Sequence, residues 1–120
     1  MTTTPLPGRP VRGSRTGRPL MAALDLLGRR WSLRILWELR DGPIGGRALR
    51  ARCDGMSSSV LYERLGELRV AGLIAQDSER AYDLTPIGRQ LNRAIEPLDA
   101  WADRWTSGPD RGQARKKRGR

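Results

Sequence analysis

The stretch that decides the fold is Gly55–Ile74, which reads GMSSSVLYERLGELRVAGLI. Ser57 suits the N-cap of a helix, because its hydroxyl can accept a hydrogen bond from a backbone N–H that the first turn leaves unpaired. The apolar residues that follow at the spacing of one helix face are Leu61, Leu65 and Leu68. Gly72 is typical of a helix C-terminus. The pattern predicts a helix over about residues 57–71 with one buried face and one polar face.

After this helix the sequence predicts a β-hairpin and a long helix. Residues 73–76 and 82–84 have the composition of short strands, and the polar residues 77–80 suit the turn between them. Thr85–Pro86 suits the cap and first position of the long helix. Its apolar residues are Ile87, Leu91, Ala94, Ile95, Leu98, Trp101, Ala102 and Trp105. Because proline inside a helix removes a hydrogen bond, we expect Pro97 to bend this helix or divide it in two.

Three shorter helices are predicted nearer the N-terminus. Pro19 suits the first turn of the first helix, and Gly28 suits its end. Trp31 begins the second helix and is expected in the core; the apolar residues that follow it are Ile35, Leu36 and Leu39. Asp41–Pro43 is a turn signal that ends this helix. A short helix follows over residues 47–52, and its inward residues are expected to be Ala48 and Leu49.

This order of elements indicates a fold class that is mainly α with a small β-hairpin. A short helix, a tight turn and a second helix with a polar outer face form a helix-turn-helix, and a hairpin directly after it makes the winged variety. Burial of one face of the helix at 57–71 leaves its other face free to enter the major groove of DNA, which is about 12 Å wide and admits one helix.

The charge of the chain is concentrated at its ends. The 120 residues include 23 Lys and Arg against 13 Asp and Glu, a formal net charge of +10. Residues 1–18 and 111–120 contain basic residues and no acidic ones, whereas residues 19–110 are formally neutral. Because the ends are poor in apolar residues, we expect disordered basic tails over 1–18 and 107–120. The remaining domain, 19–106, is small enough to suggest that it is stabilised by a partner chain.

The composition excludes several classes of function. The chain has no His, so His-based catalysis and His metal sites are excluded, and its single cysteine, Cys53, cannot form an internal disulfide. It has no glycine-rich phosphate loop, no membrane-length apolar run and no secretory signal. We therefore expect a cytoplasmic, nucleoid-associated protein that is not an enzyme and has no cofactor or metal.

A series of motifs resembles HxlR-type winged helix-turn-helix transcriptional regulators. Those in the first half are Ala23–Gly28, Trp31–Leu33, Glu38–Leu39, Asp41–Pro43 and Leu49–Arg50. Those in the second half are Gly55–Ser57, Leu61, Glu63–Leu65, Glu67–Leu68, Ala71–Ile74, Tyr82, Leu84–Thr85 and Gly88–Arg89. The resemblance covers about residues 19–101. MarR- and PadR-type regulators share the leucine-rich helix, but the full order with a Gly-x-x-Trp element in front is more specific.

The resemblance implies a dimeric bacterial DNA-binding protein that regulates nearby genes. In such proteins the first and last helices form the dimer interface, and the helix that matches the one from Ser57 contacts the major groove. The chain departs from the usual pattern in having Arg18 where Cys is common, Gly46 where an aromatic residue is usual, and Cys53 where Leu is usual. Its wing, over residues 74–84, is also shorter than the wing that is usual in the family.

Eight residues are candidates for DNA contact. They are Ser57, Ser58, Ser59 and Tyr62 on the outer face of the predicted helix, Arg64 at its border, Arg47 and Arg50 on the preceding helix, and Arg80 at the wing tip. Hydroxyls and arginines in these places can contact phosphates or base edges, and a wing arginine can enter the minor groove. The alternatives are that Ser57 is only a cap and the other hydroxyl residues are solvated, that Arg64 pairs within the chain, and that the other arginines are solvated.

Seven apolar residues are candidates for the dimer interface: Leu20, Leu24, Leu91, Ile95, Leu98, Trp101 and Trp105. The tryptophans could instead line a small-molecule pocket between subunits, although the sequence identifies no effector. Cys53 is expected to be a small buried residue; the alternative is a reactive thiol whose pKa is lowered by Arg52.

We therefore predict a homodimeric, sequence-specific regulator that binds double-stranded DNA. It would place the helix at 57–71 in the major groove and the wing at 74–84 near the minor groove. The alternative is a non-specific DNA-coating or interaction protein that keeps the fold and takes its affinity from the basic tails.

Overall fold

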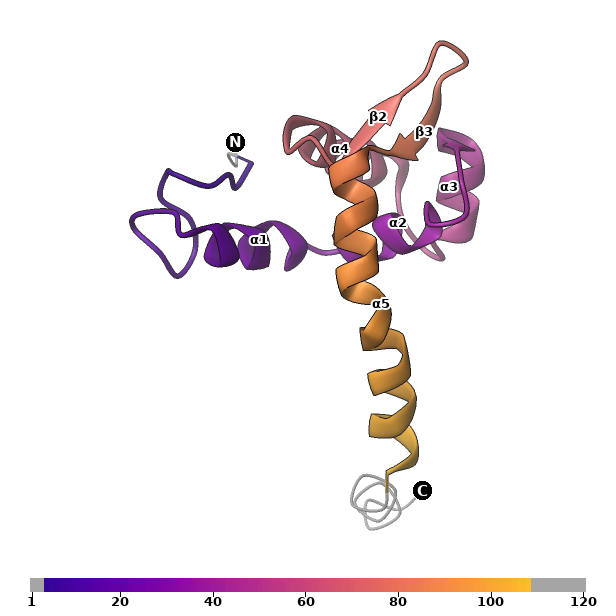
Figure 1. Cartoon of the computed structure of the whole chain (residues 1–120). Coiled ribbons are helices and arrows are strands. Elements are labelled where there is room, and N and C mark those ends of the chain that lie inside the picture. Colours follow the sequence, from indigo (N-terminus) through magenta and orange to yellow (C-terminus); the bar gives the residue numbers. More distant parts are fainter. Residues whose placement is uncertain (1–3, 109–120) are drawn as a thin grey trace. The chain divides into compact units, whose positions relative to one another are not determined.

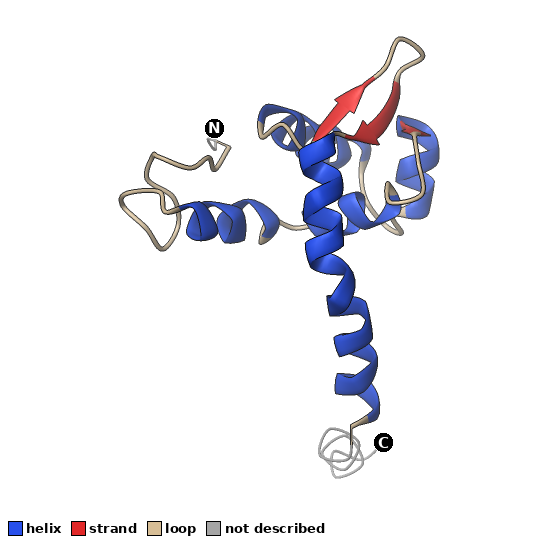
Figure 2. Ribbon diagram, viewed as in Figure 1, coloured by secondary structure: helices blue, strands red, loops and turns tan. Residues whose placement is uncertain are grey.

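The computed structural model of the chain describes residues 4–108, which form five α-helices and three β-strands (Figures 1 and 2). In chain order these are α1 (Pro19–Leu27), α2 (Ser32–Glu38), β1 (Ile44–Gly45), α3 (Gly46–Arg52), α4 (Ser58–Val70), β2 (Ile74–Gln76), β3 (Ala81–Leu84) and α5 (Pro86–Ser107). The chain divides into two compact units between Arg89 and Gln90. Within the described range, no helix is both long and apolar enough to cross a membrane.

The core of the first unit includes the apolar face of α4. Leu61, Leu65 and Leu68 are buried, as the sequence predicts. The other large buried side chains of this core are Leu26, Ile35, Leu36, Leu39, Ile44, Leu49, Met56, Ile74, Tyr82 and Leu84. Because burying one leucine side chain contributes about 1.5–3 kcal/mol, the leucines of α4 determine which of its faces stays exposed.

The wing is a hairpin within a three-stranded antiparallel sheet of order β1-β3-β2. Ile74 of β2 pairs with Leu84 of β3. The Asp77 carboxylate accepts hydrogen bonds from the backbone N–H groups of Glu79 and Ala81 at 2.8 and 2.9 Å, which closes the turn. Figure 2 shows the hairpin extending beyond the helices of the first unit. The sequence predicts both strands of the hairpin but misses β1, because two residues cannot display a period of two.

Two side chains lie differently from the sequence prediction. Trp31 is the N-cap of α2, with φ of 79°, and is half-buried instead of belonging to the core. The Arg30 guanidinium lies 5.6 Å from the centroid of the Trp31 ring, so the indole packs beneath a cation near the surface. Ala48 of α3 is exposed while Leu49 is buried, because neighbouring residues on a helix are separated by about 100°.

Residues 4–18, which we expected to be disordered, make hydrogen bonds in the structure. The backbone N–H of Arg12 donates to the Asp25 carboxylate of α1 at 3.1 Å. Gly17 has φ of 70°, and a Cβ atom there would lie 2.2 Å from the carbonyl oxygen of Arg9, so only glycine fits. Disorder was predicted because this segment has few apolar side chains. The contacts that order it instead use backbone groups and glycine.

The last helix continues through Pro97 and is not divided there. Within α5 only Gly88 is buried, and a Cβ atom on it would lie 2.0 Å from the carbonyl oxygen of Leu73. Gly88 therefore lets the start of α5 approach the chain just before β2. The helix ends at Ser107, and the basic residues of the predicted C-terminal tail, 111–120, lie outside the described part of the chain.

The packing of α4 predicts a large difference between a buried and an exposed truncation on the same helix. Leu65→Ala should lower the free energy of unfolding by about 2–5 kcal/mol, because it leaves a cavity in the core. Val70→Ala, at a residue that is 62% exposed, should change it by less than about 0.5 kcal/mol. Urea denaturation measures both, and equal effects would contradict this description of the core.

Candidate nucleic-acid interface

α3 and α4 form the predicted helix-turn-helix, joined by residues 53–57. Gly55 in this turn has φ of 74°, a conformation that favours glycine. The Arg50 guanidinium of α3 donates from Nε to the carbonyl oxygen of Met56 at 3.2 Å, and the Met56 side chain is buried. The turn is thus held by a polar contact at its surface and an apolar contact beneath, which fixes where α4 begins.

The start of α4 presents hydroxyl groups to solvent. Ser57 Oγ accepts a hydrogen bond from the backbone N–H of Val60 at 3.2 Å, so this residue is the N-cap, and it is exposed as well. Ser58 and Ser59 are exposed, and Tyr62, on the next turn, is 52% exposed. Hydroxyls both donate and accept hydrogen bonds, so this surface can meet phosphate oxygens or base edges.

Arg64 is turned away from this surface and pairs within the chain. Its Nε donates to the carbonyl oxygen of Arg30 at 2.7 Å, and its NH1 donates to the carboxylates of Glu63 at 2.8 Å and Glu67 at 3.4 Å. Its side chain is only 16% exposed. Of the two alternatives that the sequence left open, the structure shows the intramolecular pair, which also offsets the negative charge of Glu63 beside the hydroxyl surface.

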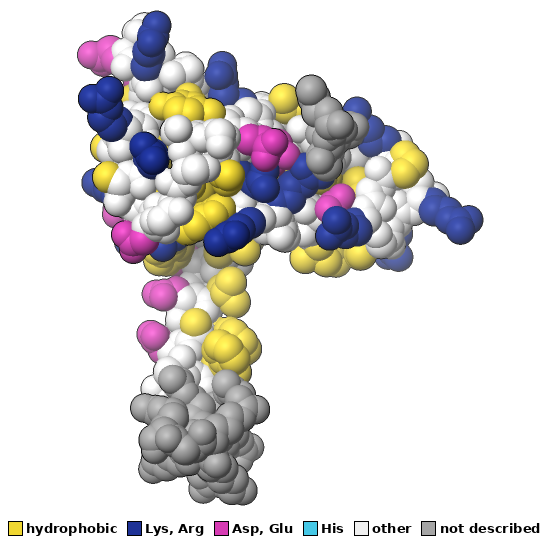
Figure 3. Space-filling view, turned by 180° about the vertical axis from the view of Figure 1, so that it is seen from behind, with side chains coloured by type: hydrophobic (Ala, Val, Ile, Leu, Met, Phe, Trp, Pro, Cys, Tyr) yellow, Lys and Arg dark blue, Asp and Glu magenta, His cyan; other side chains and the backbone are white. Residues whose placement is uncertain are grey.

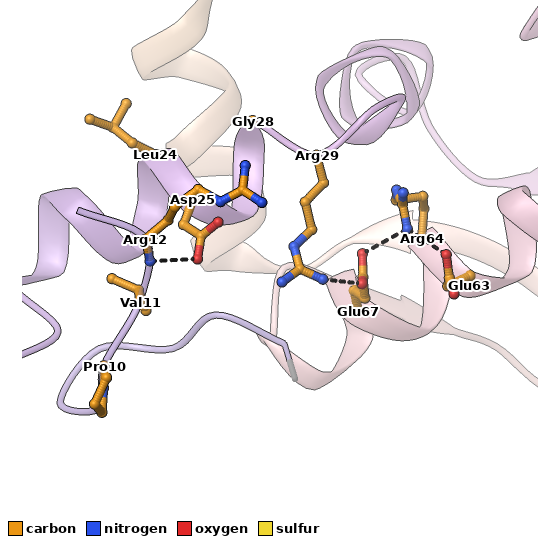
Figure 4. A pocket seen from close by; sticks show the side chains of 10 residues that line it. All are labelled: Pro10, Val11, Arg12, Leu24, Asp25, Gly28, Arg29, Glu63, Arg64 and Glu67. Atoms are coloured by element: carbon orange, nitrogen blue, oxygen red, sulfur yellow. Dashed lines mark hydrogen bonds and ion pairs between the residues drawn. The ribbon is translucent and has the colours of Figure 1, made fainter. Parts of the chain in front are cut away.

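Glu67 is the centre of this charged cluster (Figure 4). The Arg29 guanidinium, between α1 and α2, donates to the Glu67 carboxylate at 2.6 Å, and the Glu67 side chain is only 9% exposed. One buried carboxylate therefore links α4 to the α1–α2 connection. The cluster borders an open pocket of about 630 Å³, whose other lining comes from Pro10–Arg12, Leu24–Asp25 and Gly28.

The ion pair of Arg29 with Glu67 was not predicted from the sequence. The spacing of Arg64 and Glu67 on one helix is a local signal for a pair. Arg29 is 38 residues from Glu67, and only the fold brings these two side chains together.

The remaining candidate arginines lie on α3 and on the wing. Arg47 and Arg50 are both exposed on α3. Arg80 lies in the turn of the hairpin with φ of 66°, and its carbonyl oxygen accepts a hydrogen bond from the Gln76 side chain at 3.3 Å. Its side chain is exposed, so the wing carries a cation at its tip.

Cys53 is buried, as expected for a small apolar residue. Desolvation raises the pKa of its thiol, an effect larger than the opposing influence of the nearby Arg34. Because the thiolate is the reactive form, this environment does not favour the alternative of a thiol activated by Arg52. Among residues 4–108 there is also no cluster of three or more side chains that could hold a metal ion.

Residues 26–110 match the HxlR-like helix-turn-helix family. The chain belongs to this family. YvaP of Bacillus subtilis, named as an uncharacterized HTH-type transcriptional regulator, is 30% identical over 89 residues, which cover 69% of this chain and 82% of YvaP. The HxlR assignment confirms the family predicted from the motifs.

Solved structures of transcriptional regulators share the fold of this chain. The quinone-bound form of YodB from Bacillus subtilis matches with a TM-score of 0.67 and 31% identity, covering 72% of this chain and 96% of YodB. A protein from Enterococcus faecalis V583, named as a putative transcriptional regulator of the MarR family, matches with a TM-score of 0.69 and 27% identity, covering 86% of this chain and 99% of that protein. The chain is therefore a winged helix-turn-helix protein of a class of DNA-binding transcriptional regulators, and it is not an enzyme.

The charged cluster predicts unequal effects for two glutamates of α4. Glu67→Ala should lower the free energy of unfolding by about 1–3 kcal/mol, because it removes a buried carboxylate that accepts from two arginines. Glu63→Ala, whose side chain is 65% exposed, should cost less than about 1 kcal/mol. Urea denaturation of both variants tests this ranking, and an equal or smaller loss for Glu67→Ala would show that the cluster does not stabilise the fold.

Proposed function

We propose that the protein is a homodimeric regulator that binds operator sequences in double-stranded DNA. The exposed hydroxyl surface at the start of α4, a helix held in place by its buried leucines, carries this proposal. A helix held in this way can enter the major groove with its N-terminal residues toward the bases. The contacting side chains would be Ser57, Ser58, Ser59 and Tyr62.

Backbone contacts would surround this helix. Arg47 and Arg50 lie on α3, the helix that crosses the phosphate backbone in helix-turn-helix complexes. Arg80 would reach toward the minor groove from the wing. We exclude Arg64 from the proposed DNA contacts, because its guanidinium makes hydrogen bonds within the chain. The basic residues in the terminal regions would add affinity that depends on salt but little on sequence.

The apolar surface of α5 supports the proposed dimer. Trp101 and Trp105 stack with their ring centroids 5.5 Å apart, and they are 47% and 48% exposed. In Figure 3, hydrophobic side chains lie along one edge of this helix and acidic side chains along the other. A contiguous exposed apolar surface is typical of an interaction site, so a second copy of the chain is the proposed cover. Leu20 and Leu24 of α1 are also exposed, and the same proposal assigns them to the interface.

DNA selected from a random pool should contain a near-palindrome whose half-sites lie one helical turn or a multiple apart. Tyr62→Ala should weaken binding to that site by roughly 10- to 100-fold, because one side-chain contact is worth about 1–3 kcal/mol. Val70→Ala, which also truncates an exposed side chain of α4, serves as the control and should change affinity less than about twofold. Footprinting locates the bound site, and titration with the selected and a scrambled duplex measures the preference for that site.

Two results would contradict this proposal. Equal affinity for the selected and the scrambled duplex, with strong salt dependence, would identify a DNA-coating protein; the short wing favours that alternative. If footprinting finds no protected site at low salt, the proposal that the protein binds DNA is wrong.

Substitution of both tryptophans should weaken self-association. Trp101→Ala with Trp105→Ala should raise the dimer dissociation constant at least about 100-fold, because large aromatic residues dominate interface energies. Asp103→Ala, on the same helix segment, is the matched control and should leave the constant within about threefold. Sedimentation equilibrium gives these values, and a wild-type protein that stays monomeric at micromolar concentration would contradict the dimer.

A further inference from the structure

The first residue of α3, Gly46, lies directly against a proposed DNA-contacting side chain. A Cβ atom on Gly46 would lie 2.7 Å from Tyr62 Oη and 3.4 Å from Cε1 and Cζ of the same ring. The backbone of Gly46 is not in the left-handed region that favours glycine. What glycine provides at this position is therefore space for the tyrosine and not an unusual conformation.

The contact explains how Tyr62 can be half exposed and yet have a defined place. One edge of its ring lies over Gly46, while 52% of the residue remains open to solvent. Tyr62 belongs to α4 and Gly46 to α3, so the ring bridges the two helices of the helix-turn-helix. Its hydroxyl is consequently held beside the start of α3, where a DNA backbone would pass in the proposed complex.

We propose that Gly46 is a positioning residue for DNA recognition: its missing side chain lets the Tyr62 phenol occupy one place before DNA arrives. This inference rests on the proposed function. A side chain that is ordered in the free protein loses less conformational freedom on binding, which favours affinity. The phenol hydroxyl held in this place suits a phosphate oxygen, to which tyrosine commonly donates a hydrogen bond.

Adding one methyl group to Gly46 should displace the tyrosine without disrupting the fold. The atom nearest to the new methyl is the far end of the Tyr62 side chain, which can rotate away. Because an exposed side chain can move aside at little cost, the Tm of Gly46→Ala should stay close to that of the wild type. Gly45→Ala adds the same methyl one residue earlier, where nothing lies within 4 Å, and is the matched control.

A double-mutant cycle with Tyr62→Phe tests the inference, because phenylalanine lacks the atom at 2.7 Å. We expect Gly46→Ala to weaken binding to the selected DNA site about tenfold in the tyrosine protein and less than about twofold in the phenylalanine protein. Gly45→Ala should bind like the wild type. Because the contact is to a phosphate, Tyr62→Phe should weaken binding to matched and mismatched sites by similar factors.

The possible contrary results are distinct. If Gly46→Ala binds DNA like the wild type, or weakens binding equally in both backgrounds, the positioning role is wrong while the proposed function stands. If Tyr62→Phe loses affinity only at one base position, the contact is to a base and the phosphate assignment is wrong. If the wild type binds no DNA site, both the proposed function and this inference fail. Thermal unfolding of each variant identifies any loss of affinity caused by loss of fold.

Discussion

The burial of Leu61, Leu65 and Leu68 is the constraint on which the rest of the structure depends. These side chains fix the rotation of α4 about its own axis, because a helix cannot bury one stripe without exposing the opposite one. The exposed side is therefore determined by packing before any ligand is considered. Tyr62 lies between two of these leucines in the sequence and is half exposed, whereas Ser57, Ser58 and Ser59 precede the leucines and are exposed at the N-terminal end of the helix.

Polar contacts then fix the position of this helix more finely than the leucines alone. The Glu67 carboxylate accepts from Arg29 on one side and from Arg64 on the other. An ion pair that is mostly shielded from water tolerates little change in geometry, because an unpaired charge there is costly. Arg50 stabilises the turn before α4 by donating a hydrogen bond to the Met56 carbonyl oxygen. The ion pairs of Arg29 and Arg64 occupy guanidinium groups that composition alone would count as available for DNA.

Local patterns were sufficient to predict most of the fold. The cap at Ser57, the glycine after α4 and the polar turn at 77–80 each act within a few residues, so the sequence displays them directly. Contacts between distant residues were not predictable: the pair of Arg29 with Glu67 and the approach of Gly46 to Tyr62 exist only once the helices pack. The sequence prediction placed Trp31 in the core, because helical spacing gives no sign of the positive φ that the residue adopts.

Directed cleavage of DNA from α4 would test the central claim most directly. A metal chelate attached to a cysteine introduced at Ser59 would cut bound DNA near the start of the helix, and the buried native Cys53 would stay unmodified in the folded protein. We expect cuts centred in two major grooves related by a two-fold axis. Cuts scattered evenly along the duplex, or stronger cuts from a chelate placed at Val70, would show that the exposed face of α4 does not face DNA.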